Sequence, residues 1–166
     1  GEIQQFQCST VTPTSQPVTT SSGMQVPGDF TLADAGEFDL IYVPAFFYQG
    51  ISIFEQMASE LMPLCEWLIG RWRAGSTLAA NCTGTFLLAE TGLLDDRRAT
   101  TAWWLERPFR RRFPRVDLDA NALLAEDERL MTTGAMTANL NMAMHLIGRH
   151  AGPHLAAVCA KTILVD

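Results

Sequence analysis

One cysteine at a predicted strand-to-helix corner constrains this chain more than any other feature. A short apolar run over residues 78–81 ends at Cys82, and an amphipathic run over residues 86–94 begins just after it. The small residues Thr83 and Gly84 lie between the two runs. A sharp turn of this kind aims its central side chain toward a helix N-terminus, which can stabilise a thiolate or bind an anion. Hydrolases present a nucleophile in the same way, whereas a free cysteine can equally be a small buried hydrophobe.

Length and composition bound the class of protein. The chain has 166 residues, of which 48% are hydrophobic and 18% charged, and this suits one globular domain with a sizeable core. The net charge of −6 argues against bulk electrostatic binding to DNA phosphates, and the one basic cluster, residues 107–115, is predicted to be a solvated face. No apolar run is long enough to cross a bilayer, and the first residues carry no secretion signal. We therefore expect a cytoplasmic protein with no membrane partner.

The spacing of cysteine and histidine argues against a metal site. The cysteines are Cys8, Cys65, Cys82 and Cys159, with no C-x-x-C pair among them. Such wide spacing favours neither a zinc site nor a disulfide framework, and it suits a reducing cytosol. A Gly-Pro pair separates His150 from His154, so these two do not share a helical face, and His145 lies nearby. We expect no metal and no cofactor.

Apolar periodicity predicts an α/β order of elements. Strands are expected at residues 3–11, 38–43, 77–81 and 130–133, and helices at 61–72, 82–94, 103–113, 140–151 and 153–164. Pro63 is expected in the first turn of its helix, Pro108 should bend or shorten its own, and residues 126–128 should form a hairpin turn. This order implies a mostly parallel sheet with helices on both faces. Ligands bind beyond the carboxyl ends of such strands, where Cys82 and Ala45 lie.

Six stretches of the chain carry a family resemblance. They are residues 39–44, 81–94, 97–101, 113–116, 132–135 and 144–153, and the second reads Asn-Cys-Thr-Gly-Thr-Phe-Leu-Leu-Ala-Glu-Thr-Gly-Leu-Leu. Together they resemble the DJ-1/PfpI (class I glutamine-amidotransferase-like) superfamily. The last stretch is more similar to the effector domains of AraC-type transcription regulators than to the stand-alone enzymes. The resemblance implies a flavodoxin-like, three-layer α/β sandwich with a mostly parallel sheet.

Four departures from the family pattern bear on catalysis and completeness. The family's domain opens with a strand and helix that supply an acid beside the cysteine, and we expect that unit to be missing here. Similar isonitrile hydratases place a histidine directly after the position of Thr101, where this chain has Ala102. The family's Pro-Gly-Gly oxyanion turn is Pro44-Ala45-Phe46, whose alanine and phenylalanine resist positive φ. No helix-turn-helix follows Asp166.

The resemblance and its departures together predict a sensor. We expect residues 1–166 to form a single DJ-1/PfpI-like ligand-sensing domain, N-terminally incomplete, of a bacterial AraC-type regulator with no catalytic residue. A small-molecule effector should bind near a set of former active-site positions: Cys82, Thr83, Ala45, Phe46, Ala102 and Trp103. DNA would be bound only through a helix-turn-helix domain absent from this chain. A homodimer is the expected assembly for a regulator that reads two half-sites.

Two alternatives to the sensor remain open. The first is a cysteine-dependent enzyme of the same superfamily, of hydratase, amidase or deglycase type, with Cys82 as its nucleophile. Nucleophilic catalysis needs an activated thiol, an oriented base and an oxyanion site, and here a helix N-terminus that lowers the thiol pKa would serve only ligand capture or oxidation sensing. The second is a dimerisation module with an inert cleft. The missing first strand should also leave an open sheet edge, which another segment or a partner would cover.

Overall fold

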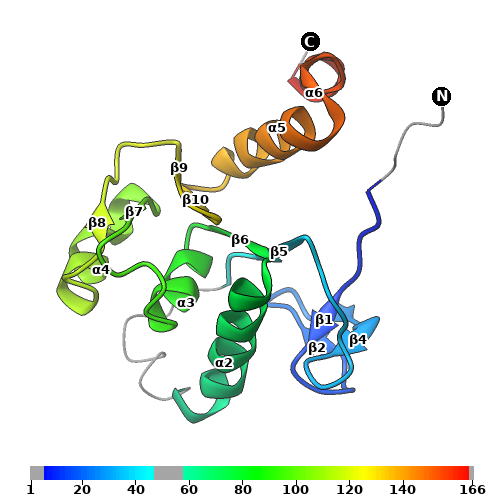
Figure 1. Cartoon of the computed structure of the whole chain (residues 1–166), viewed down its shortest axis with the longest axis vertical. Helices are drawn as coiled ribbons and strands as arrows, with labels where there is room; N and C mark the ends of the chain where they lie inside the picture. Colours follow the sequence, from blue (N-terminus) through cyan, green and yellow to red (C-terminus); the bar gives the residue numbers. More distant parts are fainter. Residues whose placement is uncertain (1–5, 47–57, 165–166) are drawn as a thin grey trace.

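A four-stranded sheet organises the protein. The computed structural model describes residues 6–46 and 58–164 (Figure 1). The strands are β5 (Leu40–Val43), β6 (Thr77–Asn81), β10 (Leu130–Thr133) and β9 (Leu124–Asp127), in that spatial order. The first three are parallel, and β9 returns antiparallel to β10. The predicted α/β class is confirmed, with the strand bounds of β6 and β10 as expected.

Helices cover both faces of this sheet. On one face, α2 (Ala58–Ala74) and α3 (Gly84–Glu90) pack over Leu78 and Ala80 of β6. On the other face, α5 (Ala138–Ala151) covers Ala79 and Met131 with its own Met142. Successive residues of a strand point to opposite faces of the sheet. Because β6 has apolar side chains on both faces, helices bury it from both sides. The last helix, α6 (Pro153–Leu164), packs on α5 at the outside of the molecule (Figure 1).

Two-residue strands complete the domain around the central sheet. β7 (Arg98–Ala99) pairs in parallel with β8 (Asp117–Leu118), and between them lie a 3₁₀ turn, η1 (Trp103–Leu105), and α4 (Glu106–Arg112). The helix expected over residues 103–113 is therefore divided at Glu106. Pro108 falls in the first turn of α4, where its missing N–H removes no intrahelical bond.

The segment before β5 differs from its prediction. It forms β1 (Val11–Thr12), β2 (Val18–Thr19), β3 (Gln25–Val26) and β4 (Phe30–Thr31), with β1 parallel to β4 and β2 antiparallel to β3. The strand expected over residues 3–11 is wrong at residues 6–10, which are exposed and outside any ladder, and residues 3–5 lie outside the described part. Only Val11 and Thr12 pair in a ladder, with β4, while the Thr10 carbonyl accepts from the N–H groups of Asp29 and Phe30 just before it.

β5 is an edge of the four-stranded sheet in the described part of the chain. The carbonyl of Asp39 accepts a hydrogen bond from the N–H of Thr77 at 2.9 Å. Backbone groups alternate in direction along a strand, so those of Ile41 face β6 while those of Leu40 and Tyr42 face outward. β5 is the end strand of this four-stranded order, and the open edge left by a missing first strand stays a prediction.

Three local expectations are corrected. Pro63 lies inside α2 and not in its first turn, because the helix already runs from Ala58. The helix after Cys82 ends at Glu90 and not at residue 94, and Gly92 follows with a φ of 72°. The hairpin turn expected at residues 126–128 lies later, since β9 continues to Asp127 and Glu128 takes a φ of 52°. In the first and third cases helix or ladder hydrogen bonding extends past the residues used as boundary signals, and in the second the helix stops short of them.

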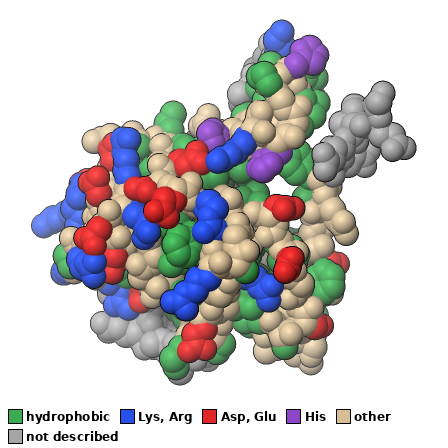
Figure 2. Space-filling view, viewed as in Figure 1, with side chains coloured by type: hydrophobic (Ala, Val, Ile, Leu, Met, Phe, Trp, Pro, Cys, Tyr) green, Lys and Arg blue, Asp and Glu red, His purple; other side chains and the backbone are tan. Residues whose placement is uncertain are grey.

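Charged side chains of both signs lie interspersed on the face of the molecule seen in Figure 2. The basic cluster is paired with acids as a solvated face would be: Arg110 with Glu106, Arg112 with Glu90, and Arg115 with Asp95 and Asp96. Exposed pairs of this kind contribute little stability. Among the described residues, no helix has the length and apolarity needed to span a membrane.

Candidate functional site

The cysteine elbow lies where the sequence places it, between β6 and α3. β6 ends at Asn81, α3 begins at Gly84, and Cys82 takes a φ of 50°. This left-handed conformation is uncommon for a residue with a Cβ and is retained where neighbours hold it. Two bonds fix the Cys82 backbone: its N–H donates to the Thr133 carbonyl at 3.0 Å, and its carbonyl accepts from the Thr101 hydroxyl at 2.7 Å.

Glycine at position 84 allows the elbow to approach the end of β5. A Cβ on Gly84 would lie 2.6 Å from the Val43 carbonyl oxygen and 2.8 Å from that of Pro44. Both are backbone atoms, so neither can rotate out of the way. The contact between α3 and β5 therefore requires a glycine at position 84, two residues after Cys82.

Thr83 joins the elbow to the turn that follows β5. Its hydroxyl oxygen accepts from the Phe46 N–H at 2.8 Å and donates to the Phe46 carbonyl at 2.8 Å. The structure thus brings Phe46 to Thr83, and Ala45 and Cys82 are their neighbours along the chain. A backbone N–H that would otherwise be free to stabilise an oxyanion in this turn is held by a side chain.

The thiol of Cys82 is buried and protonated at neutral pH. Its residue is only 6% exposed and packs in the apolar cluster that includes Val43 and Phe86. Burial raises the pKa of the Cys82 thiol above its ordinary value, and the Thr83 N–H opposes this rise. The N–H at the helix N-terminus does lower this pKa, as the sequence allows, but desolvation by burial is the larger effect and the net shift is upward.

The two predicted residues beyond β7 differ in exposure. Ala102 directly follows Thr101, whose hydroxyl contacts the Cys82 carbonyl, but Ala102 is 0% exposed and belongs to the core. Trp103 is 71% exposed and stands perpendicular to Trp104, with ring centroids 5.6 Å apart. Ala102 is therefore part of the core next to the site, and the Trp103 ring faces solvent.

The described histidine contacts lie on the α5 side of the sheet. His145 is 3.1 Å from a Glu126 carboxylate oxygen, and the His150 ring packs edge-on against Phe6 at 6.2 Å. His154 is exposed at the start of α6. These contacts supply no imidazole base to the Cys82 thiol. No group of three potential metal ligands lies together in residues 6–46 and 58–164.

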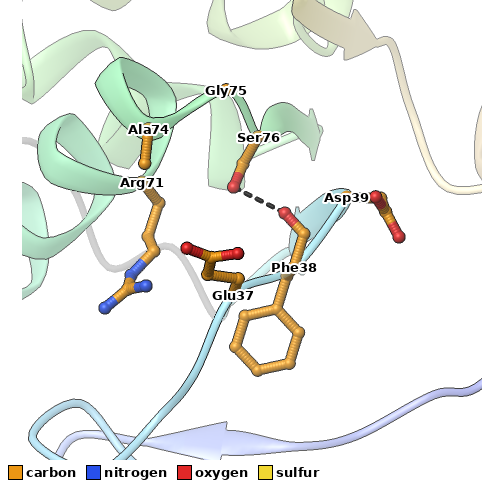
Figure 3. Close-up of a pocket in the computed structure, with 7 residues that line it drawn as sticks. All are labelled: Glu37, Phe38, Asp39, Arg71, Ala74, Gly75 and Ser76. Atoms are coloured by element: carbon orange, nitrogen blue, oxygen red, sulfur yellow. Dashed lines mark hydrogen bonds between the residues drawn. The ribbon is translucent and has the colours of Figure 1, made fainter.

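Two surface cavities lie away from the elbow. One of about 380 Å³ is lined by Glu37, Phe38, Asp39, Arg71, Ala74, Gly75 and Ser76 (Figure 3). The Ser76 hydroxyl closes one wall by donating to the Phe38 carbonyl at 2.6 Å. This cavity is at the amino ends of β5 and β6, whereas Cys82 is at the carboxyl end. The other cavity lies among the charged residues around Arg97 and Arg115.

Sequence reasoning missed a group of polar side chains on the α5 side of the elbow. Asn81 and Thr133 are buried at the ends of β6 and β10, and the Tyr42 hydroxyl donates to Asn139 of α5 at 2.8 Å. The available signal was the period of two within each strand, which puts Tyr42, Asn81 and Thr133 on one face of the sheet.

These features define a class before any comparison. A mainly parallel sheet between helical layers, with a left-handed cysteine between a central strand and a short helix, is a cysteine-elbow α/β sandwich. The model of the DJ-1/PfpI family matches residues 2–149, and the chain belongs to that family.

Named relatives are similar over most of this chain. The chain is 33% identical over 149 residues to the HTH-type transcriptional regulator CdhR of Pseudomonas aeruginosa, covering 90% of this chain and 42% of that protein. It is 30% identical over 146 residues to the HTH-type transcriptional regulator GbdR of the same species, covering 88% of this chain and 38% of that one. The chain thus spans less than half the length of either relative.

A solved structure supports the fold. The crystal structure of an AraC family transcriptional regulator from Pseudomonas putida superposes with a TM-score of 0.73 at 17% identity, covering 96% of this chain and 82% of that chain. At this identity the likeness concerns the fold alone.

Proposed function

We propose that this chain is the small-molecule-sensing domain of a bacterial AraC-type transcription regulator and that it is not catalytic. The effector binds beside the elbow, against Cys82, Thr83, Ala45 and Phe46, with Trp103 at the exposed rim and Ala102 beneath. DNA is contacted through a helix-turn-helix domain outside residues 1–166, in a cytoplasmic homodimer. The similarity to two HTH-type regulators over about nine-tenths of this chain supports the assignment.

The state of the elbow is the observation that carries this proposal. The thiol is buried with a raised pKa, and the Phe46 N–H is engaged by Thr83. The described contacts of the histidines are with Glu126 and Phe6. Nucleophilic catalysis requires an activated thiol and an oriented base, and the described residues give Cys82 a raised thiol pKa and histidines that contact Glu126 and Phe6 instead.

The cysteine-dependent enzyme remains the second candidate because of one observation. Cys82 keeps the left-handed φ of 50° by which nucleophile elbows present their side chains. We expect no turnover of isonitriles, carboxamides or glycated amines by the chain. Turnover that is lost in Cys82→Ser would instead establish the enzyme.

Ligand-dependent stabilisation tests the sensing function. The chain would be screened against a metabolite library by thermal shift, and hits titrated by calorimetry. A ligand at about 100 times its Kd stabilises by about 2.7 kcal/mol, so an effector should raise the Tm clearly. Thr83→Val, which removes two hydrogen bonds to Phe46, should weaken binding about tenfold, while Val158→Ala on the exposed face of α6 should not.

Two results would refute the sensor. One is a screen in which no metabolite raises the Tm. The other is a set of hits whose affinities are the same in Thr83→Val and in the parent chain. Either result, with an intact dimer, would favour the third possibility, a dimerisation module with an inert cleft.

A further inference from the structure

Two buried polar atoms beside the elbow have no hydrogen-bond partner in the described structure. They are Oδ1 of Asn81 and Oγ1 of Thr133, in residues that are 5% and 0% exposed. Native interiors pair nearly all such groups, with protein, ordered water or ligand, because an unpaired one loses its solvation without compensation. This pair therefore calls for a partner that the described chain does not supply.

The strand register puts these two atoms on the same face. Thr133 and Asn81 are direct partners in the parallel ladder between β10 and β6. Two residues earlier, Met131 and Ala79 are partners and pack against Met142 of α5. Side chains two apart share a face, and adjacent strands are about 4.8 Å apart. Asn81 and Thr133 thus stand side by side under the first turn of α5.

Tyr42 and Asn139 form the exposed rim of this region. Tyr42 is the register partner of Ala79 and is 37% exposed, and its hydroxyl donates to Asn139 at 2.8 Å. Burial raises the pKa of the Tyr42 phenol, and the nearby Cys82 adds to that rise. Tyr42, Asn81 and Thr133 therefore lie close to the elbow, at the carboxyl end of the sheet.

The chemistry of the pair selects the ligand group. Asn81 Oδ1 can only accept a hydrogen bond, and the Thr133 hydroxyl can donate one. In the orientation that the structure gives the Asn81 amide, with Oδ1 toward the subsite, a carboxylate would meet this oxygen with no proton between them. A cation would lie near the positive end of the α5 dipole. The charged groups of this face, Glu126 with His145 and Arg149, bond to one another further back along the strands.

We propose that Asn81 and Thr133 form a subsite for an uncharged carboxamide group of a small molecule. The ligand N–H donates to Asn81 Oδ1, and the ligand carbonyl accepts from Thr133 Oγ1. Tyr42 and Asn139, bonded to each other, lie on the same face of the sheet as the subsite. The proposal rests on the proposed sensing function, because it names the chemistry of a ligand for the same region.

Acetamide is the probe that tests the subsite. It would be titrated into the isotope-labelled chain, with amide chemical shifts recorded by NMR, and acetone serves as a near-isosteric control that lacks an N–H. Acetamide should give saturable shifts at Asn81, Thr133 and Asn139, and acetone should not. Thr133→Val should raise the Kd about tenfold, and Thr162→Val on the exposed side of α6 should leave it unchanged.

The Tm of Thr133→Val without acetamide shows whether this variant is folded, so that a weaker binding is not mistaken for misfolding. Thr133→Val keeps the shape of the side chain and removes an unpartnered hydroxyl, so without probe its Tm should equal or exceed that of the parent chain. The subsite is overturned by the absence of saturable acetamide shifts, by equal binding of acetone, or by an unchanged Kd in Thr133→Val.

The subsite and the sensing function fail in distinguishable ways. Suppose a metabolite without a carboxamide binds beside Cys82 with equal affinity in Thr133→Val and the parent chain, and acetamide gives no shifts. Then the sensing function stands and the subsite is wrong. If acetamide binds as described but no metabolite does, the subsite stands and the sensing function is wrong.

Discussion

Replacing Gly84 with alanine tests the packing that positions the elbow. The new Cβ would lie 2.6 and 2.8 Å from the carbonyl oxygens of Val43 and Pro44, well inside contact distance. Overpacking of this kind costs about 1–3 kcal/mol of unfolding free energy. Because the neighbouring atoms are backbone atoms that cannot move aside, we expect a cost in the upper half of that range. Alanine loses less backbone entropy than glycine on folding, and this offsets about 0.5 kcal/mol of the cost. We therefore expect a net loss of about 2 kcal/mol.

Thermal unfolding measures this loss against a matched glycine. For a domain of this size, each kcal/mol shifts the Tm by about 2–4 °C, so Gly84→Ala should unfold about 4–8 °C lower. Gly70 of α2 has open space around its Cβ position, so Gly70→Ala should be stabilising by about 0.5–1 kcal/mol. A Gly84→Ala variant as stable as the parent chain would refute the close approach of α3 to β5.

Two further predictions concern titration and the sheet edge. Burial raises the pKa of the Cys65 thiol to about 11 from 9.0, and that of Cys82 also rises. Unfolded thiols then ionise first, so the part of the unfolding free energy due to these thiols should be constant below about pH 9 and fall above it. Urea denaturation of a Cys65→Ala, Cys82→Ala variant should show a smaller fall above about pH 9 than the parent chain, and an equal fall would contradict this. By hydrogen exchange, the amides of Leu40 and Tyr42 should exchange faster than that of Ile41, and equal protection in a monomer would mean that β5 is not an open edge.

Much of the fold could be predicted because its signals are local. The apolar run of β6, the small residues after Cys82 and the break at Gly152 each determine structure over a few neighbouring residues. The N-terminal segment could not be predicted, because residues 6–10 have strand-like composition but no ladder partner. Whether such a segment is a strand depends on what lies beside it, and periodicity does not carry that information.

The candidate site divides in the same way. The sequence by itself determined that a cysteine stands at a strand-to-helix corner, with Ala45 and Phe46 following the neighbouring strand and Ala102 directly after Thr101. The tertiary structure alone decided that the thiol is desolvated, that Thr83 occupies the Phe46 N–H, and that Asn81 and Thr133 stand unpartnered together. The physical reason is that burial, pKa and hydrogen-bond satisfaction depend on atoms distant in sequence, here up to 52 positions apart between Asn81 and Thr133.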